Sequence, residues 1–223
     1  DARKSRGLGD VYKRQTFGIL DNRSSEESCQ AACRASLSMF QQLQRLNTHR
    51  AIENSDPIKM AFGVHTGEIT AGVIQPDDSF EYIFCGEAMD KVEFCKGVGK
   101  EYISETFILV SDVCHEMISS KFMFRELDKV SGENYDAVRL FELLGESKTD
   151  LDPIKGKACN HYREGLGHYK ARRWRIASEH FKKAWEVNFD KPGHMLYNRC
   201  KGYVESPLNA PMEDWDGSIH LDI

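Results

Sequence analysis

The chain has 223 residues, 40% of them hydrophobic, with a formal net charge of −5 and a mean hydropathy of −0.53. It contains no run of roughly 18 to 20 apolar residues and no signal-peptide pattern, so we expect no membrane segment here and favour a cytoplasmic globular protein. The acidic charge gives no reason to expect a nucleic-acid partner, and seven scattered cysteines without a CxxC pair argue against a disulfide framework.

The first fifteen residues are set apart from the rest. They end in DVYKRQ, a string that the end sequence of a transposase-based sequencing adapter encodes. We therefore expect residues 1–15 to be an adapter artefact and exclude them from the fold. The protein itself then enters at about Thr16, as the C-terminal piece of a longer reading frame whose N-terminal region could include a membrane anchor.

A helix is predicted over about residues 25–47. Ser24 and Glu27 have the spacing of a capping box, in which each side chain bonds the backbone N–H of the other residue. Apolar residues then recur at intervals of three, four and seven, which places them on one face of a helix. Asp56-Pro57 breaks the chain after this helix, because proline cannot continue one.

Two β-prone stretches come next, IKMAFGVH and EITAGVI, separated by Thr66-Gly67. This arrangement predicts a β-hairpin that turns at Thr66-Gly67. Both stretches carry apolar residues for each face, which is typical of strands covered on both sides in a layered α/β domain.

The remaining elements alternate between strand and helix. FEYIF predicts a strand that leads through Gly86 into a helix near residues 87–97. FILVS then predicts a strand, DVCHEMI a helix, and FMFRELDKV and AVRLFELLG a closing pair of strands. This alternation predicts an α/β or α+β fold with a mostly antiparallel sheet.

The composition changes after Gly145. Residues 147–156 are polar, contain Pro and Gly and lack periodicity, so they are predicted to be a linker. Residues 157–205 carry two aromatic-rich helical stripes, which predict a helical hairpin of the size of one tetratricopeptide (TPR) unit, and a third helix started by Pro192. One such unit cannot bury its own apolar face, so we expect it to pack on the α/β domain or on the tail, residues 206–223.

These motifs, in this order, resemble the class III adenylate/guanylate cyclase domain. FGVHTGEITAGVI is similar to the family's strand GIHTGE followed by AGxIG, and EYIFCGEAMDKV is similar to its strand and helix GDxVNxAxR. FILVS and LFELLGE are similar to its later strands. Residues 16–146 therefore resemble the C-terminal two-thirds of that domain, and the helices after them resemble the extension of many bacterial cyclases. The resemblance implies a ferredoxin-like α+β domain.

The resemblance also implies partners and cofactors. The family works as head-to-tail dimers, so we expect a homodimer or a heterodimer with another cyclase domain, with ATP or GTP as substrate. Two aspartates of the family hold two Mg²⁺ or Mn²⁺ ions, which activate the ribose 3′-oxygen and neutralise the phosphates. Both aspartates belong to strands that precede this chain, so no metal ligand is assigned. The other Asp, Glu and His residues show no cluster with ligand spacing, and His65 is expected to be structural.

The resemblance assigns the nucleotide site to four positions. Ile83 takes the base-selecting position, and Gly86 precedes the helix that faces the nucleotide. Asp90 stands where the family has the asparagine that positions the ribose, and Phe94 where it has the arginine that stabilises the triphosphate. A carboxylate only accepts hydrogen bonds and a phenyl ring donates none, so neither role is kept. Restoring asparagine and arginine is expected to raise turnover in the complete protein.

Three functions remain open. The residues favour a catalytically degenerate cyclase homologue that serves as a regulatory or dimer-partner half in cyclic-nucleotide signalling. The second is an adenylate cyclase that converts ATP to cyclic AMP and pyrophosphate when complete. The third is a protein-interaction adaptor that works through its TPR-like helices.

Overall fold

The computed structural model describes residues 15–19, 23–75, 81–102, 106–133, 135–147, 149 and 151–221. Most of the stretch expected to be an adapter artefact lies outside these residues, as do residues 148 and 150 of the expected linker and 222–223 of the tail. None of the described helices is long and apolar enough to span a lipid bilayer.

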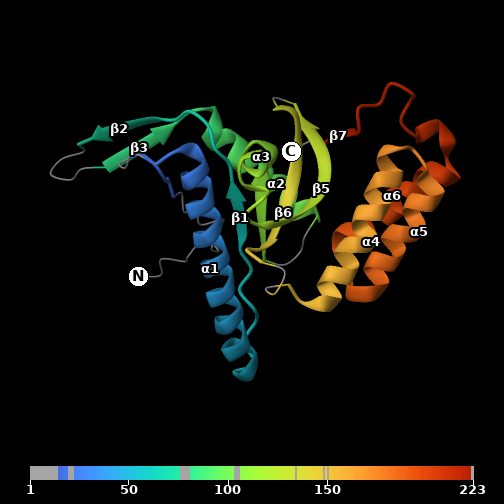
Figure 1. Ribbon diagram of the computed structural model, residues 1–223, viewed down its shortest axis with the longest axis horizontal. Coiled ribbons are helices and arrows are strands. Elements are labelled where there is room, and N and C mark those ends of the chain that lie inside the picture. The colour runs from blue at the N-terminus through green and yellow to red at the C-terminus, as the bar shows by residue number, and fades with distance from the viewer. Residues whose placement is uncertain are drawn as a thin grey trace, which may run out of the picture.

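A five-stranded mixed sheet forms the centre of the molecule, in the order β1-β4-β6-β5-β7 (Figure 1). Its strands are Ala61–Val64 (β1), Phe107–Ser111 (β4), Met123–Gly132 (β5), Tyr135–Gly145 (β6) and Ser218–His220 (β7). β1 pairs with β4 and β7 with β5 in parallel, whereas β6 runs antiparallel to both β4 and β5. The predicted α/β class with mixed helices and strands is confirmed, and the tail supplies a strand that was not predicted.

The predicted hairpin at Thr66-Gly67 is wrong. β2 (Thr70–Ile74) pairs antiparallel with β3 (Glu81–Cys85) instead of with β1. Together, β2 and β3 form a two-stranded arm that projects from the five-stranded sheet (Figure 1). The connection from β1 to β2 therefore leads from the central sheet to the arm.

Two helices, α1 (Ser25–Ile52) and α3 (Asp112–Ile118), cover one face of the sheet. The predicted capping box is confirmed, since Ser24 Oγ accepts from the backbone N–H of Glu27 at 3.2 Å and Glu27 Oε2 accepts from that of Ser24 at 2.9 Å. α1 continues to Ile52, beyond the predicted end at 47. The buried residues beneath these helices form one cluster: Cys29, Cys33, Val64, Ile108, Val110, Cys114, Ile118, Phe122 and Leu143. All seven cysteines are free thiols, and three of them, Cys29, Cys33 and Cys114, lie in this cluster.

α2 (Glu87–Tyr102) covers the opposite face and extends past its predicted end at residue 97. Gly97 and Gly99 lie within this helix, although glycine weakens a helix interior. A Cβ at Gly99 would lie 2.4 Å from a ring carbon of Phe107, so the missing side chain lets α2 lie directly against β4. Tertiary packing therefore overrides helix propensity at this position.

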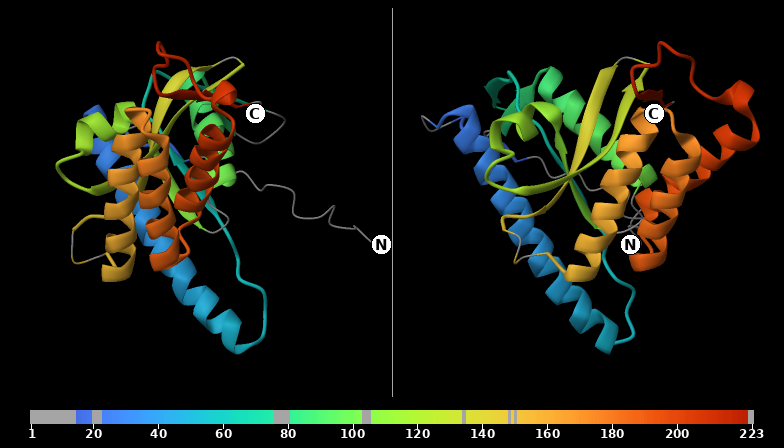
Figure 2. Two further views of the ribbon diagram at one scale, coloured as in Figure 1. Left: turned by 90° about the vertical axis from the view of Figure 1, so that its right-hand side faces the viewer. Right: turned by 45° about the vertical axis from the view of Figure 1, so that its right-hand side comes forward.

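Three helices of the extension, α4 (Pro153–Lys170), α5 (Trp174–Asn188) and α6 (Lys191–Glu205), pack side by side (Figure 2). They share one buried cluster with α2 and the sheet, which includes Phe94, Leu109, Val130, Tyr162, Phe181 and Leu196. The expectation that the helices pack on the α/β part is therefore confirmed. α4 begins at Pro153, so residues 153–156 of the predicted linker are helical.

A buried charge network around Arg125 of β5 joins the sheet to the extension. Arg125 contacts Glu142 of β6 and lies 2.6 Å from Asp190 Oδ1, and its side chain is 2% exposed. Lys155 of α4 reaches both carboxylates, at 3.3 and 3.7 Å. Burial alone would lower the pKa of Arg125, but the two carboxylates raise it, so the guanidinium stays charged. Asp190 also caps α6 by accepting from the backbone N–H of Gly193 at 3.0 Å.

A second network lies around Asp128, which is 1% exposed. Its Oδ2 accepts from the hydroxyl of Tyr102 at 2.6 Å and from Arg199 of α6 at 2.5 Å. Arg199 also donates to the hydroxyl of Tyr169 at 3.1 Å. One carboxylate thereby connects β5, α2, α4 and α6.

Candidate functional site

The four positions assigned from the resemblance lie on β3 and at the start of α2. Gly86 joins these elements with φ of +138°, a conformation that side chains disfavour. A Cβ there would also lie 2.9 Å from the carbonyl oxygen of Glu68, in the connection that enters β2. Glycine at this position is therefore required by the backbone itself, and it holds the start of α2 against the β1–β2 connection.

Asp90 and Phe94 do not face a common site. Asp90 is exposed on the first turns of α2. Phe94 is 5% exposed and belongs to the core cluster shared with the extension. The four-residue spacing predicted that both side chains share one functional face of α2. In the structure Asp90 faces solvent and Phe94 lies in the core. Residue 94 is thus a packed position.

Ile83 lies on the arm, away from the core. It is 45% exposed and sits opposite Gly72 of β2. The structure therefore places the base-selecting position on a projecting two-stranded element, whereas Gly86 and Asp90 lie where the arm returns to α2. Of the four predicted residues, Asp90 and Phe94 lie on α2, Ile83 lies on β3, and Gly86 joins these two elements.

His65 was expected to be a structural residue of the hairpin, but it bonds to the central sheet instead. It follows β1, and its Nδ1 lies 2.8 Å from the Oγ of Ser111 at the end of β4. Burial lowers the pKa of His65, Lys91 lowers it further, and Asp112 opposes this effect. A neutral imidazole bonded to a hydroxyl fixes the end of β1 and offers no charge to a ligand.

The residues around β1 and α2 do not fit the Mg²⁺ or Mn²⁺ ions that the resemblance implies. These ions prefer carboxylate oxygens, and the structure gathers no group of three acidic or metal-ligating side chains in this region of the described chain. Among the described residues, the only such group is His161, Glu164 and His180 in the extension, where imidazoles predominate. This group spans two helices, so it is a cluster in space that the spacing along the sequence did not indicate.

The chain was compared with known proteins by sequence and by structure. No family model matches the sequence, and no curated protein matches it. Solved structures do match. The adenylyl cyclase CyaB from P. aeruginosa is 17% identical with a TM-score of 0.53, and the alignment covers 61% of this chain and 68% of that one. The guanylyl cyclase Cya2 is 19% identical with a TM-score of 0.51, over 59% of this chain and 64% of that one.

This chain has the fold of these cyclases. At identities below 20% the likeness establishes the fold and not the activity. The chain spans about two-thirds of the length of each of these cyclases.

Sequence reasoning missed the two buried charge networks and the histidine group of the cyclase-fold chain. Arg125 and Asp128 stand within the predicted strand FMFRELDKV, and a charge at an inward position of a strand is a signal for a buried partner. The i,i+3 spacing of His161 and Glu164 was also visible. Their third partner, His180, lies on the next helix, so the local sequence could not identify it.

Proposed function

We propose that the chain is a catalytically degenerate cyclase homologue that serves as a regulatory or dimer-partner half in cyclic-nucleotide signalling. The burial of Phe94, at the position where the family has an arginine, carries this proposal. A side chain that fills the core cannot present positive charge to a triphosphate. Asp90, one turn earlier and exposed, would add a carboxylate that repels the phosphates of ATP or GTP.

The same observation changes one expectation from the sequence. Asp90→Asn combined with Phe94→Arg was expected to raise turnover. In the folded chain, Phe94→Arg would place a guanidinium among apolar residues without a carboxylate designed to pair with it, which is costly. We now expect that double variant to lose stability rather than to gain activity.

The partner role is supported by the exposed arm. Val73 on β2 and Ile83 on β3 are 56% and 45% exposed. A two-stranded hairpin is marginal by itself in water, so an arm with exposed apolar side chains gains stability from a covering surface. We propose that this surface belongs to a second cyclase-fold domain, in a homodimer or a heterodimer, and that Mg²⁺ or Mn²⁺ would be held by residues other than those described.

The adaptor alternative receives less support from the packing. Tyr169 and Phe181, central to the aromatic stripes of the TPR-like helices, are fully buried. Trp174 is packed against Tyr169 and Trp215, with ring centroids 5.3 and 5.5 Å apart. The aromatic stripes therefore stabilise the fold itself and are not available to an outside partner.

The test has two arms on the purified chain. Incubation with Mn²⁺ and ATP or GTP is expected to give no cyclic nucleotide above the protein-free background. Sedimentation analysis, alone and mixed with an active cyclase domain, is expected to show a dimer that Ile83→Asp dissociates. Val113→Asp is the matched control, since Val113 is 42% exposed on α3, away from the arm.

The two arms separate the alternatives. Cyclic AMP that accumulates with the chain alone would overturn the degenerate assignment and favour an active adenylate cyclase. A chain that stays monomeric in both mixtures would overturn the partner role, whatever its activity.

A further inference from the structure

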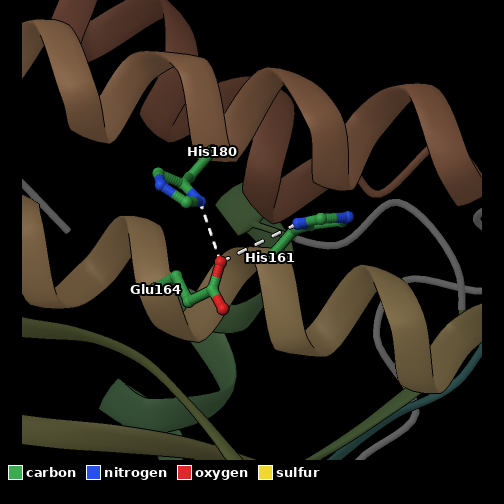
Figure 3. Close-up of side chains that lie close together, drawn as sticks. All are labelled: His161, Glu164 and His180. Atoms are coloured by element: carbon green, nitrogen blue, oxygen red, sulfur yellow. Dashed lines mark ion pairs between the residues drawn. The ribbon is translucent and has the colours of Figure 1, made fainter.

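Three side chains with metal-ligand chemistry meet between α4 and α5 (Figure 3). His161 and Glu164 lie three residues apart on α4, and His180 projects toward them from α5. The i,i+3 spacing puts the first two on one face of their helix. The packing of α5 against α4 then supplies the third group, so the cluster exists only in the folded hairpin.

The distances suit a single small ion. His180 Nδ1 lies 3.0 Å and His161 Nδ1 4.0 Å from the same carboxylate oxygen, Oε2 of Glu164. One donor atom from each residue lies within 4.8 Å of the others. Tetrahedral ligands about 2.0 to 2.2 Å from Zn²⁺ are roughly 3.3 to 3.6 Å from one another. Small side-chain rotations would therefore bring the three donors to that spacing.

Two buried imidazole nitrogens of the cluster have no hydrogen-bond partner among the described residues. The Nδ1 atoms of His161 and His180 are buried, and neither has a hydrogen-bond partner in the described structure. The 3.0 Å approach of Glu164 is an ion-pair distance without hydrogen-bond alignment. Buried imidazole nitrogens without partners are uncommon, since buried polar atoms are normally satisfied. A bound cation would satisfy both at once.

We propose that His161, Glu164 and His180 bind a divalent transition-metal ion of the Zn²⁺ type. Two imidazoles and one carboxylate are ligands that Zn²⁺ accepts, whereas Mg²⁺ and Ca²⁺ prefer an all-oxygen set. Three protein ligands leave a fourth position for water or for a donor from another molecule. Glu164 is 57% exposed, so this position opens to solvent. The ion cross-links α4 to α5, at a place separate from the β1 and α2 region.

The experiment uses the 223-residue chain, freed of metal with a chelator, and titrates it with ZnCl₂ or CoCl₂. We expect one equivalent to bind and the melting temperature to rise with Zn²⁺ concentration, because the ion binds the folded hairpin more tightly than the unfolded chain. His161→Gln, His180→Gln and Glu164→Gln should each weaken binding at least tenfold. His194→Gln is the control: it removes an imidazole of α6 that stacks on Trp185 at 4.4 Å, outside the cluster, and should leave the affinity unchanged.

Cobalt distinguishes this site from a thiol site. We expect the spectrum of the Co²⁺ form to lack a near-ultraviolet thiolate charge-transfer band, even though Cys85 is exposed. Such a band, or absence of binding, would overturn the proposal. So would a loss of affinity in His194→Gln equal to that in His180→Gln. Circular dichroism checks the fold of each variant, and Glu164→Gln, at an exposed position, provides the test if a histidine variant unfolds.

Discussion

At the scale of single residues, the half-buried His65 makes the stability of the molecule depend on pH. Burial and Lys91 lower its pKa in the folded chain, whereas in the unfolded chain it is near 6.5. The unfolded state therefore takes up a proton first as the pH falls. The stability contributed by neutral His65 is present above about pH 6.5 and is lost progressively below it.

We expect the free energy of unfolding to fall between pH 7 and pH 5, by at most about 1.4 kcal/mol per pH unit for one proton. His65→Gln should flatten this dependence. His115, whose pKa is also lowered, first by burial, contributes in the same direction, so part of the slope will remain. Urea titrations at several pH values provide the measurement, and an unchanged slope in His65→Gln would contradict the assignment.

Residue-level prediction succeeded where one local rule decides the outcome. Ser24 and Glu27 are a capping box because their spacing alone allows the two reciprocal hydrogen bonds. Phe94 was different. Phe94 follows Asp90 by four residues, and this spacing gives their relative positions on α2. Which side of α2 is buried depends on the extension that packs against it. That information is not in the local sequence.

At the scale of elements, Arg125 shows how the extension is attached to the sheet. Arg125→Met would leave the carboxylates of Glu142 and Asp190 buried, with Lys155 as the only cation that the described residues place against them. Removing one partner of a buried ion pair typically costs about 3 to 5 kcal/mol. We expect a loss of this size in the free energy of unfolding, measured by urea denaturation.

Arg139→Met is the control for this prediction. Arg139 pairs with Glu116 at 2.8 Å, but the two side chains are 43% and 67% exposed. Exposed pairs contribute roughly 1 kcal/mol or less. Equal losses in the two variants would show that the Arg125 network does not hold the elements together.

The sequence predicts the strands themselves better than it predicts which strands pair. Their existence followed from apolar and β-branched runs, and β4 and α3 have the predicted bounds. The pairing of the strands could not be predicted in the same way, because backbone hydrogen bonds can form between any two strands of suitable length. β1 found its partner in β4, across α2, rather than in the adjacent β2. Thr66-Gly67 has turn composition but lies in a connection that packs against the start of α2, since a Cβ at Gly67 would lie 3.0 Å from the Cβ of Ala88.

At the scale of the whole molecule, the shared core predicts that the sheet and the extension unfold together. The three tryptophans, Trp174, Trp185 and Trp215, all lie in the C-terminal part. Cys29, Cys33 and Cys114 are buried on the opposite face of the sheet. Fluorescence and thiol labelling thus report on two distant regions of one chain.

We expect both probes to give the same urea midpoint, because one cluster runs from α6 to β4 without a boundary. Labelling is followed by mass spectrometry of the peptides, since Cys85 is exposed and reacts in the folded state. Tryptophan fluorescence that changes at a clearly lower urea concentration would show that the extension is an independent domain.

The strand β7 has a consequence for aggregation. β5 is ten residues long, and without β7 one of its sides would offer free backbone N–H and C=O groups to any other chain. β7 covers part of that side through pairing at Lys129, Val130 and Ser131, and its own free side is only three residues long. The sheet thus ends in a short unpaired strand edge instead of a long one. The ribosome synthesises β7 after α4, α5 and α6. In a nascent chain, the edge of β5 therefore stays unpaired until these helices have been made.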